Sequence, residues 1–506
     1  MSEKLYADLR DLSLGLNQKD GATLILDQEL VDAENVILGK GFAQKRYGFE
    51  KYSNQLANPI TKLYDYKKYN GTKEFLSVSN KQLYKDNNGT LTAITGALTS
   101  NSVKFMTYKD RSINDATVIA DGGKLKVYKG TSVSEVSPRT PNTAEQTYPG
   151  LNDLANLSNF RTFALKKDRI FAAAHPTVKN RVSYNYFDPY LGYGVYDYFP
   201  AIYFFDVATE DNDEIVELKV FRDLLIILCK KSVWALRGDG VTLNDNEVFK
   251  INVPIGCIAS GSVQEVGNNL FYLGDDNVYS IFATDRDFVS GQIMSDKIAP
   301  ILKSIGSTDK ALATSVFFDN KYWLSFPSGL TLVYDTILEN WTKFTNIKAN
   351  SFLVRDGVLY FSSNAGYIYR FNENKFSDDG QPINYMIKSK ILDLGAPINK
   401  KKFRRLWINQ KQFDSYHSSF QIKVLIDQSN LIDLATSSDS SGTNEQGVWD
   451  VSDWDEAIWD TTETLINKFR VRQQSKDIQI QIFNNIVDEP LSILGFVLEY
   501  EMKKPK

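Results

Sequence analysis

The sequence predicts an all-β protein whose largest part is a β-propeller of six to eight blades. The main observation is one short pattern, written three times in succession at residues 269–282, 321–334 and 358–371. Each copy has a run of aromatic and β-branched residues, a small polar turn and a second such run, which is the pattern of a β-hairpin. A repeated four-strand unit of about 40 residues is typical of a propeller blade, which buries its faces by packing on its neighbours.

Four earlier segments carry the same pattern, at residues 60–94, 102–136, 160–186 and 215–250. With the three copies above they make seven candidate units, and because the first and last units of a repeat are often atypical, the prediction covers six to eight blades. We assign the propeller to residues 59–379, with a loop insertion near 183–207. A short helix is predicted at residues 295–305, where four apolar residues stand at helical spacing: Ile298, Ile301, Leu302 and Ile305.

Residues 1–58 are expected to form an N-terminal arm or clasp. Within this arm, residues 27–38 predict a short helix that begins at Asp27 and carries four apolar residues on one side: Leu30, Ala33, Val36 and Ile37. Glycines at 15, 41 and 48 suit turns on either side of it. We expect the arm to contribute to assembly with other subunits.

Residues 380–506 are expected to form a C-terminal β-sandwich. Here the alternation of apolar and polar residues becomes long and regular, in segments 420–426, 478–482 and 494–500. Long strands with a period of two suit sheets that bury one face each.

Bulk composition excludes several classes of protein. The formal net charge is −4, so bulk positive charge does not hold this chain on nucleic acid. No apolar run approaches the roughly 20 residues that span a bilayer, and the first residues lack the apolar segment of a secretory signal. Cys229 and Cys257 both lie in apolar surroundings, and we interpret them as buried thiols; a disulfide between them is the alternative.

The sequence offers no catalytic or metal-ligating arrangement, so we expect no enzyme activity, no metal and no cofactor. The chain has two histidines, His175 and His417, in different predicted domains. Nucleophilic triads need a histidine beside the nucleophile, and zinc sites need clustered Cys or His. Phosphate-binding glycine motifs are also absent.

Three clusters are candidate contact surfaces. Residues 449–460 combine five carboxylates with Trp449, Trp454 and Trp459, and could bind calcium or a glycan, or form an exposed acidic hairpin. Residues 183–200 hold six tyrosines, including Tyr190, Tyr193 and Tyr196, which suit a sugar or protein interface, or a loop folded over the propeller. The basic run 400–405 could touch phosphates, but we favour a solvated edge strand.

The order of several motifs resembles the tail nozzle, or tail tubular protein B-like, family of short-tailed bacteriophages. Its Gly-Leu-Asn, Ala-x-Asn and Arg-x-Gly opening is similar to Gly15-Leu16-Asn17, Ala33-Glu34-Asn35 and Arg46-Tyr47-Gly48. Segments 182–188 and 234–238 are similar to its middle propeller region, and segments 255–258, 332–335 and 340–342 to its later blades. Segments 478–482 and 493–500 resemble its closing sandwich strands.

The resemblance implies a structural protein of the virion tail, made in the host bacterial cytoplasm. It implies a homo-hexameric ring beneath the head-to-tail adaptor or portal-associated protein, with lateral contacts to tail fibres or spikes. Genomic DNA would pass through the ring without specific binding, in line with the acidic balance of the chain. Leu16, Asn17, Arg46, Gly48, Tyr190, Tyr193, Tyr196, Trp454 and Trp459 are the candidate assembly or partner contacts.

Two alternatives stay open at this point. The first is a receptor- or glycan-binding propeller adhesin that uses the tyrosines of 183–200 or the acidic segment 449–460. The second is a glycosidase propeller, for which Asp455 and Asp460 would be the candidate acid and base.

Overall fold

The computed structural model describes residues 3–109, 115–138, 159–188, 193–194, 196–200, 203–208, 212–238, 247–283, 289–413, 418–437 and 464–503. Within these residues the fold is all-β, as the sequence predicts. In the described ranges, helix is limited to four short pieces: η4 (Ser260–Ser262), η5 (Asp296–Ile298), α1 (Ala299–Ser304) and α2 (Ser307–Ala311). The second and third form the helix predicted at 295–305, and they bury Ile298 and Leu302.

Five separate four-stranded antiparallel sheets follow one another along the described chain, and each is a meander of strands. The first is β7 (Ile60–Lys67), β8 (Lys73–Ser79), β9 (Gln82–Asn87) and β10 (Thr90–Ala97); the second is β11 (Lys104–Lys109), β12 (Asp115–Ala120), β13 (Lys126–Tyr128) and β14 (Val133–Glu135). The third is β15 (Thr162–Lys166), β16 (Arg169–Ala173), β17 (Arg181–Tyr184) and β20 (Phe204–Asp206), beside the small pair β18 (Phe187–Asp188) and β19 (Tyr193–Gly194). The fourth is β21 (Ile215–Phe221), β22 (Leu224–Cys229), β23 (Val233–Arg237) and β24 (Glu247–Lys250); the fifth is β25 (Gln264–Val266), β26 (Asn269–Leu273), β27 (Val278–Ala283) and β28 (Val289–Ile293).

Two further four-stranded units belong to larger sheets. One is β29 (Thr314–Phe318), β30 (Lys321–Ser325), β31 (Thr331–Asp335) and β32 (Asn340–Phe344), at one end of a ten-stranded sheet. The other is β33 (Ser351–Arg355), β34 (Val358–Ser362), β35 (Ile368–Asn372) and, as its fourth strand, β6 (Gly48–Lys51) from the N-terminal part of the chain; β36 (Ser377–Asp378) and β37 (Gln381–Pro382) extend this sheet. The predicted hairpins at 269–282, 321–334 and 358–371 are the pairs β26–β27, β30–β31 and β34–β35.

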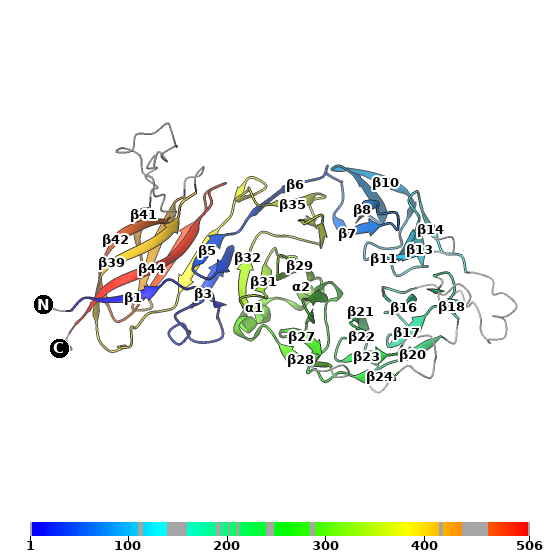
Figure 1. Cartoon of the computed structure of the whole chain (residues 1–506), viewed down its shortest axis with the longest axis horizontal. Helices are drawn as coiled ribbons and strands as arrows, with labels where there is room; N and C mark the ends of the chain where they lie inside the picture. The colour runs from blue at the N-terminus through cyan, green and yellow to red at the C-terminus, as the bar shows by residue number, and fades with distance from the viewer. Residues whose placement is uncertain are drawn as a thin grey trace, which may run out of the picture.

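The seven units lie around a common centre, and the labelled first strands β7, β11, β21 and β29 face it (Figure 1). β7 contacts both β11 and β33, and further contacts join β11 to β15, β15 to β21, β25 to β29 and β29 to β33. A shared hydrophobic cluster joins the fourth unit to the fifth, where Ile226 and Leu228 pack with Leu270 and Tyr272. Four-stranded sheets that stack face to face around an axis are the arrangement of a β-propeller.

A second β region lies beside this ring (Figure 1). One of its sheets runs β4 (Val36–Gly39), β5 (Phe42–Lys45), β44 (Ser492–Met502), β39 (Lys401–Lys411) and β42 (Thr464–Ser475), with β1 (Leu5–Leu9) also paired to β44. The other continues from β32 through β3 (Glu29–Glu34), β38 (Tyr385–Ser389), β43 (Ile478–Asn484), β40 (Phe420–Ile426) and β41 (Asn430–Ser437), with β2 (Gly15–Leu16) beside β3. Both sheets contribute to one hydrophobic core, in which Phe403, Leu406 and Phe496 join Ile422 and Ile480.

The helix predicted at residues 27–38 is wrong, because the segment forms β3 and β4. Pairing of β3 with β38 shifts register between Leu30 and Asp32, which turns both Leu30 and Ala33 inward and imitates helical spacing. Asn35, with φ of +55°, then separates the two strands.

The basic run 400–405 is not a solvated edge. β39 lies between β44 and β42 in the middle of its sheet. Lys401 is fully buried and donates to the carbonyl oxygens of Ala396 and Lys476, each at 2.6 Å. Arg404 pairs with Glu501 at 2.8 Å. The charges of this run therefore stabilise the strand through contacts inside the chain.

We predict that Phe49→Ala lowers the free energy of unfolding by about 3–5 kcal/mol, because a large buried ring is removed from the strand that completes the seventh unit. Phe49 is 6% exposed and packs edge-on against Phe361 and Tyr369, with ring centroids at 4.9 and 5.2 Å. Urea unfolding followed by circular dichroism measures the change. Leu24→Ala is the control, since Leu24 is 80% exposed and its truncation should cost less than about 0.5 kcal/mol. Equal losses in the two variants would contradict a structural role for β6.

Candidate functional site

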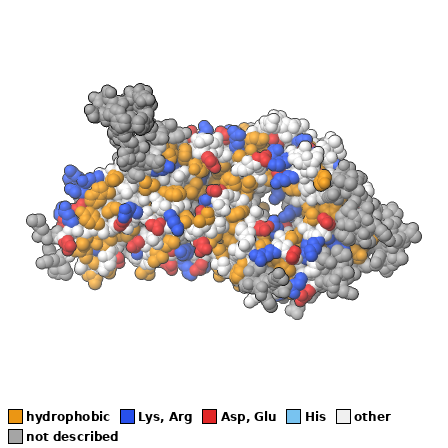
Figure 2. Space-filling view, viewed as in Figure 1, with side chains coloured by type: hydrophobic (Ala, Val, Ile, Leu, Met, Phe, Trp, Pro, Cys, Tyr) orange, Lys and Arg blue, Asp and Glu red, His pale blue; other side chains and the backbone are white. Residues whose placement is uncertain are grey.

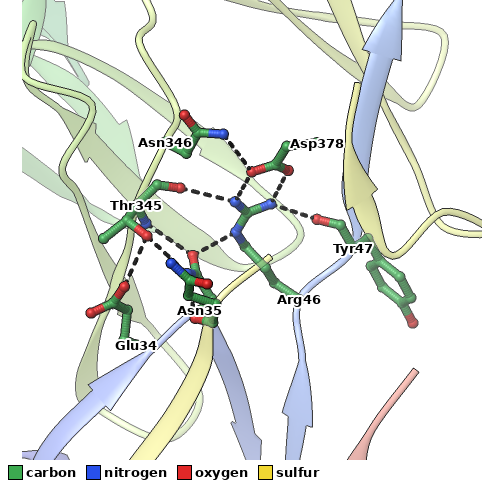
Figure 3. A network of polar contacts seen from close by, with 8 residues as sticks. Glu34, Asn35, Arg46, Tyr47, Thr345, Asn346 and Asp378 are labelled. Carbon is green, nitrogen blue, oxygen red and sulfur yellow. Dashed lines mark hydrogen bonds and ion pairs between the residues drawn. The ribbon is translucent and has the colours of Figure 1, made fainter. Parts of the chain in front are cut away.

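Arg46 lies where the N-terminal strands, the ring of sheets and the second β region meet (Figure 3). The residue falls between β5 and β6, and only 1% of it is exposed. Its guanidinium makes a two-pronged ion pair with Asp378 on β36: Nη1 donates to Oδ1 at 2.8 Å and Nη2 to Oδ2 at 2.6 Å. Charge-assisted pairs of this geometry are among the strongest polar contacts in proteins. Residues 46 and 378 are thereby held together across most of the chain length.

The remaining donors of Arg46 are also used. Nε donates to Asn35 Oδ1 at 2.8 Å, Nη1 to the Tyr47 carbonyl at 3.0 Å, and Nη2 to the Thr345 carbonyl at 2.9 Å. An arginine has five N–H donors, and all five have acceptors here. Burying a charge costs free energy through desolvation, and hydrogen bonds to every polar group offset that cost. The complete pairing of Arg46 therefore allows its charge to lie in a dry interior.

Asn35 connects Arg46 to two further segments (Figure 3). Its Oδ1 also accepts the backbone N–H of Thr345 at 2.9 Å, and its Nδ2 donates to Thr345 Oγ1 at 2.8 Å and to the Asn384 carbonyl at 2.7 Å. Thr345 follows β32 and Asn384 precedes β38. One asparagine amide therefore joins the end of the sixth unit to the start of a strand in the second β region.

Lys45, the neighbour of Arg46, makes its contacts with the second β region. Its side chain is fully buried, and Nζ donates to Asn484 Oδ1 at 2.8 Å, the Ile486 carbonyl at 2.9 Å and the Glu489 carbonyl at 3.1 Å. Burial lowers the pKa of Lys45 to about 8. Adjacent cations thus anchor one short segment to both parts of the molecule.

The other predicted N-terminal residues lie inside the subunit as well. A Cβ atom at Gly48 would collide with the Ser377 carbonyl, because β6 and β36 approach closely there. Leu16 is fully buried, and Asn17 Nδ2 donates to Glu29 Oε2 at 3.0 Å. The structure thus places Leu16, Asn17, Arg46 and Gly48 in contact with other segments of their own chain.

The tyrosine segment contributes mainly to packing where it is described. Tyr184 stacks on Tyr203 with ring centroids 5.1 Å apart, and Tyr186 packs on Tyr198 at 5.3 Å. Tyr196 is partly buried, 6.2 Å from the Tyr108 ring. Tyr193 belongs to the short strand β19. Tyr190, Trp454 and Trp459, with the acidic segment 449–460, lie outside the described residues.

Beside Arg46, a cavity of about 420 Å³ lies between the sixth and seventh units. Its apolar wall includes Phe318, Trp323, Phe344 and Phe371, and its charged rim includes Lys321 and Arg370. Trp323 is 8% exposed, and its Nε1 has no hydrogen-bond partner in the described structure. A ligand with a flat apolar face and an oxygen acceptor would suit such a site. Sequence reasoning missed this cavity because its lining combines the sixth and seventh units with Ile37, Arg46 and Tyr47, and no motif marks it.

The cysteines are buried thiols and His175 bonds within its own turn, while His417 lies outside the described residues. Cys229 and Cys257 are free and buried, as expected, and burial raises the pKa of each thiol to about 12. Burial lowers the pKa of His175, whose Nδ1 accepts the backbone N–H of Thr177 at 3.2 Å. Among the described residues, no three His, Cys, Asp or Glu side chains gather as metal ligands. None of the described helices is long and apolar enough to cross a membrane.

No protein-family model matches the chain, and no curated protein matches it either. Among solved structures, virginiamycin B lyase from Staphylococcus aureus is similar at 9% identity and a TM-score of 0.42, over 65% of this chain and 99% of that one. BamB from Moraxella catarrhalis is similar at 12% identity and a TM-score of 0.38, over 74% and 97%. Both are β-propeller proteins. At these scores any assignment of function depends on the chain's own geometry.

We predict that Arg46→Met and Asp378→Asn each lower the free energy of unfolding by about 3–5 kcal/mol, because each leaves an unpaired group in a buried site. Arg46→Lys should also destabilise, since an ammonium cannot reproduce the two-pronged contact. Guanidinium unfolding at pH 7 measures all three. Arg10→Met is the matched control: its pair with Asp8 is exposed, and its loss should leave the free energy of unfolding almost unchanged.

Similar losses for Arg10→Met and Arg46→Met would contradict the importance of burial. The double variant Arg46→Met/Asp378→Asn should lose less than the two single changes together, because it removes both buried charges at once.

Proposed function

We propose that this chain is a structural subunit of a bacteriophage tail, in the distal tail tube, nozzle or hub. The observation that carries the proposal is the buried Arg46–Asp378 pair, which fixes the N-terminal strands, the ring of sheets and the second β region to one another. A subunit in the wall of a tail must keep its parts in a fixed orientation under force. A buried arginine that is fully paired between those parts would hold them in that orientation.

The architecture we propose is a seven-bladed β-propeller joined to a β-sandwich. The seven four-stranded units support the blade number, with the N-terminal strand β6 closing the last blade. Two sheets around one core support the sandwich, in which strands β1, β3, β4 and β5 complete the strands of residues 380–506. Rigid β modules of this kind are suited to building walls.

The location of the motifs that resemble the tail nozzle family supports the proposal. Asn35, Arg46 and Gly48 all lie at the junction, and Gly15 packs against Trp341 and Asn340 at the end of the sixth unit. Motifs that are scattered in the sequence therefore serve one structural task. That coherence favours a shared architecture over chance similarity of short patterns.

The proposed assembly is a homo-hexameric ring around the DNA-ejection channel. Its partners would be the head-to-tail adaptor or portal-associated protein above, tail fibres or spikes beside it, and genomic DNA passing through without specific binding. The formal net charge of −4 supports this last point, because strong phosphate attraction would retard a sliding duplex.

We expect about six copies of the chain in each virus particle, located at the tail. Quantitative mass spectrometry of gradient-purified particles from the source measures the copy number, and immunogold labelling of the chain gives its position. Absence from the particles, or label along fibres, would contradict the tube-wall role.

Recognition of a glycan is a second candidate function, favoured by the cavity beside Arg46. Aromatic walls with a polar rim are suited to stacking and hydrogen bonding of a sugar, and Lys321 and Arg370 place charged donors beside Trp323.

For this alternative, titration with monosaccharides to millimolar concentration should change tryptophan fluorescence in a saturable way, and Trp323→Phe should abolish the change. Trp407→Phe is the control, since Trp407 lies on β39 outside the cavity. A linear or absent response in the parent protein would end the glycan hypothesis.

A further inference from the structure

Lysine side chains from different sheets gather near the axis of the ring. Lys62 lies on β7, Lys104 on β11 and Lys219 on β21, and each of these is the first strand of its sheet. The contacts of β7 with β11, β11 with β15 and β15 with β21 place these strands side by side around the centre. On the face seen in Figure 2, Lys and Arg side chains gather around the hollow in the middle of the ring.

The shared neighbour of these lysines is Glu217, which is 3% exposed. Its Oε1 accepts from Lys104 Nζ at 2.9 Å, from the hydroxyl of Thr162 and from the backbone N–H of Leu218 at 3.1 Å. This oxygen is therefore fully engaged by the second, third and fourth sheets. The cluster thus brings together side chains from four of the first strands that surround the axis.

The two other ammonium groups lack such a partner. Neither Lys62 nor Lys219 makes a side-chain hydrogen bond or ion pair to any described residue, although both are partly buried. Burial lowers the pKa of both, and the charge of Lys104 adds to the effect, while Glu217 opposes it. Nearby Glu265 also acts on Lys219, but it is exposed on β25. Two cations near a third one, with one engaged carboxylate among them, form a site with surplus positive charge.

We propose that the propeller axis holds an oxyanion of the phosphate class between Lys62, Lys104 and Lys219. An unpaired ammonium in a partly buried position is unfavourable, and a bound anion would offset that cost. The donor set suits this class of ligand. All three cations are lysines, whose ammonium groups are compact point charges that bind phosphate groups from several directions.

The site is independent of the Arg46 junction and of the cavity beside it, since none of its residues lines either. A phosphate-class anion there would contact at least three sheets at once. Binding would therefore stabilise the ring as a whole, because a ligand that binds only the folded state raises its apparent stability.

The test uses inorganic phosphate on the full chain. Thermal unfolding and isothermal titration calorimetry are run against phosphate at constant ionic strength, with chloride as the reference salt. We expect saturable binding at one site per chain and a rise of the midpoint temperature that saturates with it. The double variant Lys62→Met/Lys219→Met should bind at least tenfold more weakly.

Two controls separate a specific site from general charge and folding effects. Lys40→Met/Lys400→Met removes the same charge from exposed positions and should bind phosphate as the parent protein does. In chloride alone, Lys62→Met/Lys219→Met should unfold at a temperature equal to or above that of the parent, since two unpaired cations are removed. No saturable binding in the parent, or undiminished binding in Lys62→Met/Lys219→Met, would overturn the proposal.

Discussion

The structure depends on one buried ion pair, between Arg46 and Asp378. A charge in a dry interior is tolerated only when its polar atoms are paired, and Arg46 meets that condition because its five N–H groups donate to acceptors on four residues. The acceptors come from separate segments, near β4, β6, β32 and β36. Each segment must therefore place its acceptor at the same guanidinium. This requirement fixes the direction and register of the segments, which hydrophobic packing alone would not fix.

This constraint explains how the chain closes its ring and attaches its second β region with the same residues. β6 begins two residues after Arg46 and pairs with β35, so that the N-terminal and C-terminal parts of the propeller share a sheet. β5 ends one residue before Arg46, and β3 pairs with both β32 and β38. An error in the placement of residues 45–48 would disturb the last blade and the adjoining sheets together. Residues 45–48 therefore affect both the ring of sheets and the second β region.

The sequence predicted the parts of the fold that depend on local patterns. Hairpins at 269–282, 321–334 and 358–371 are present because aromatic and β-branched runs around a polar turn specify their own pairing. Two predictions failed where long-range pairing decides the outcome. The register shift in β3 imitated a helix at Leu30 and Ala33. The strand order placed β39 between two other strands, although the basic run 400–405 resembles an edge. The Arg46 motif could be located but not explained, because its partner is 332 residues away.

The junction and the propeller axis show two ways in which this fold treats buried positive charge. At the junction, every donor of Arg46 meets a protein acceptor, so nothing is left for a ligand and the site serves the fold. On the axis, Glu217 engages Lys104, while Lys62 and Lys219 have no side-chain hydrogen bond or ion pair to a described residue. The stability of a domain has little margin for uncompensated charge. Arg46 is paired completely by the protein, whereas Lys62 and Lys219 are not. We therefore propose that an anion from solution offsets the positive charge at the axis.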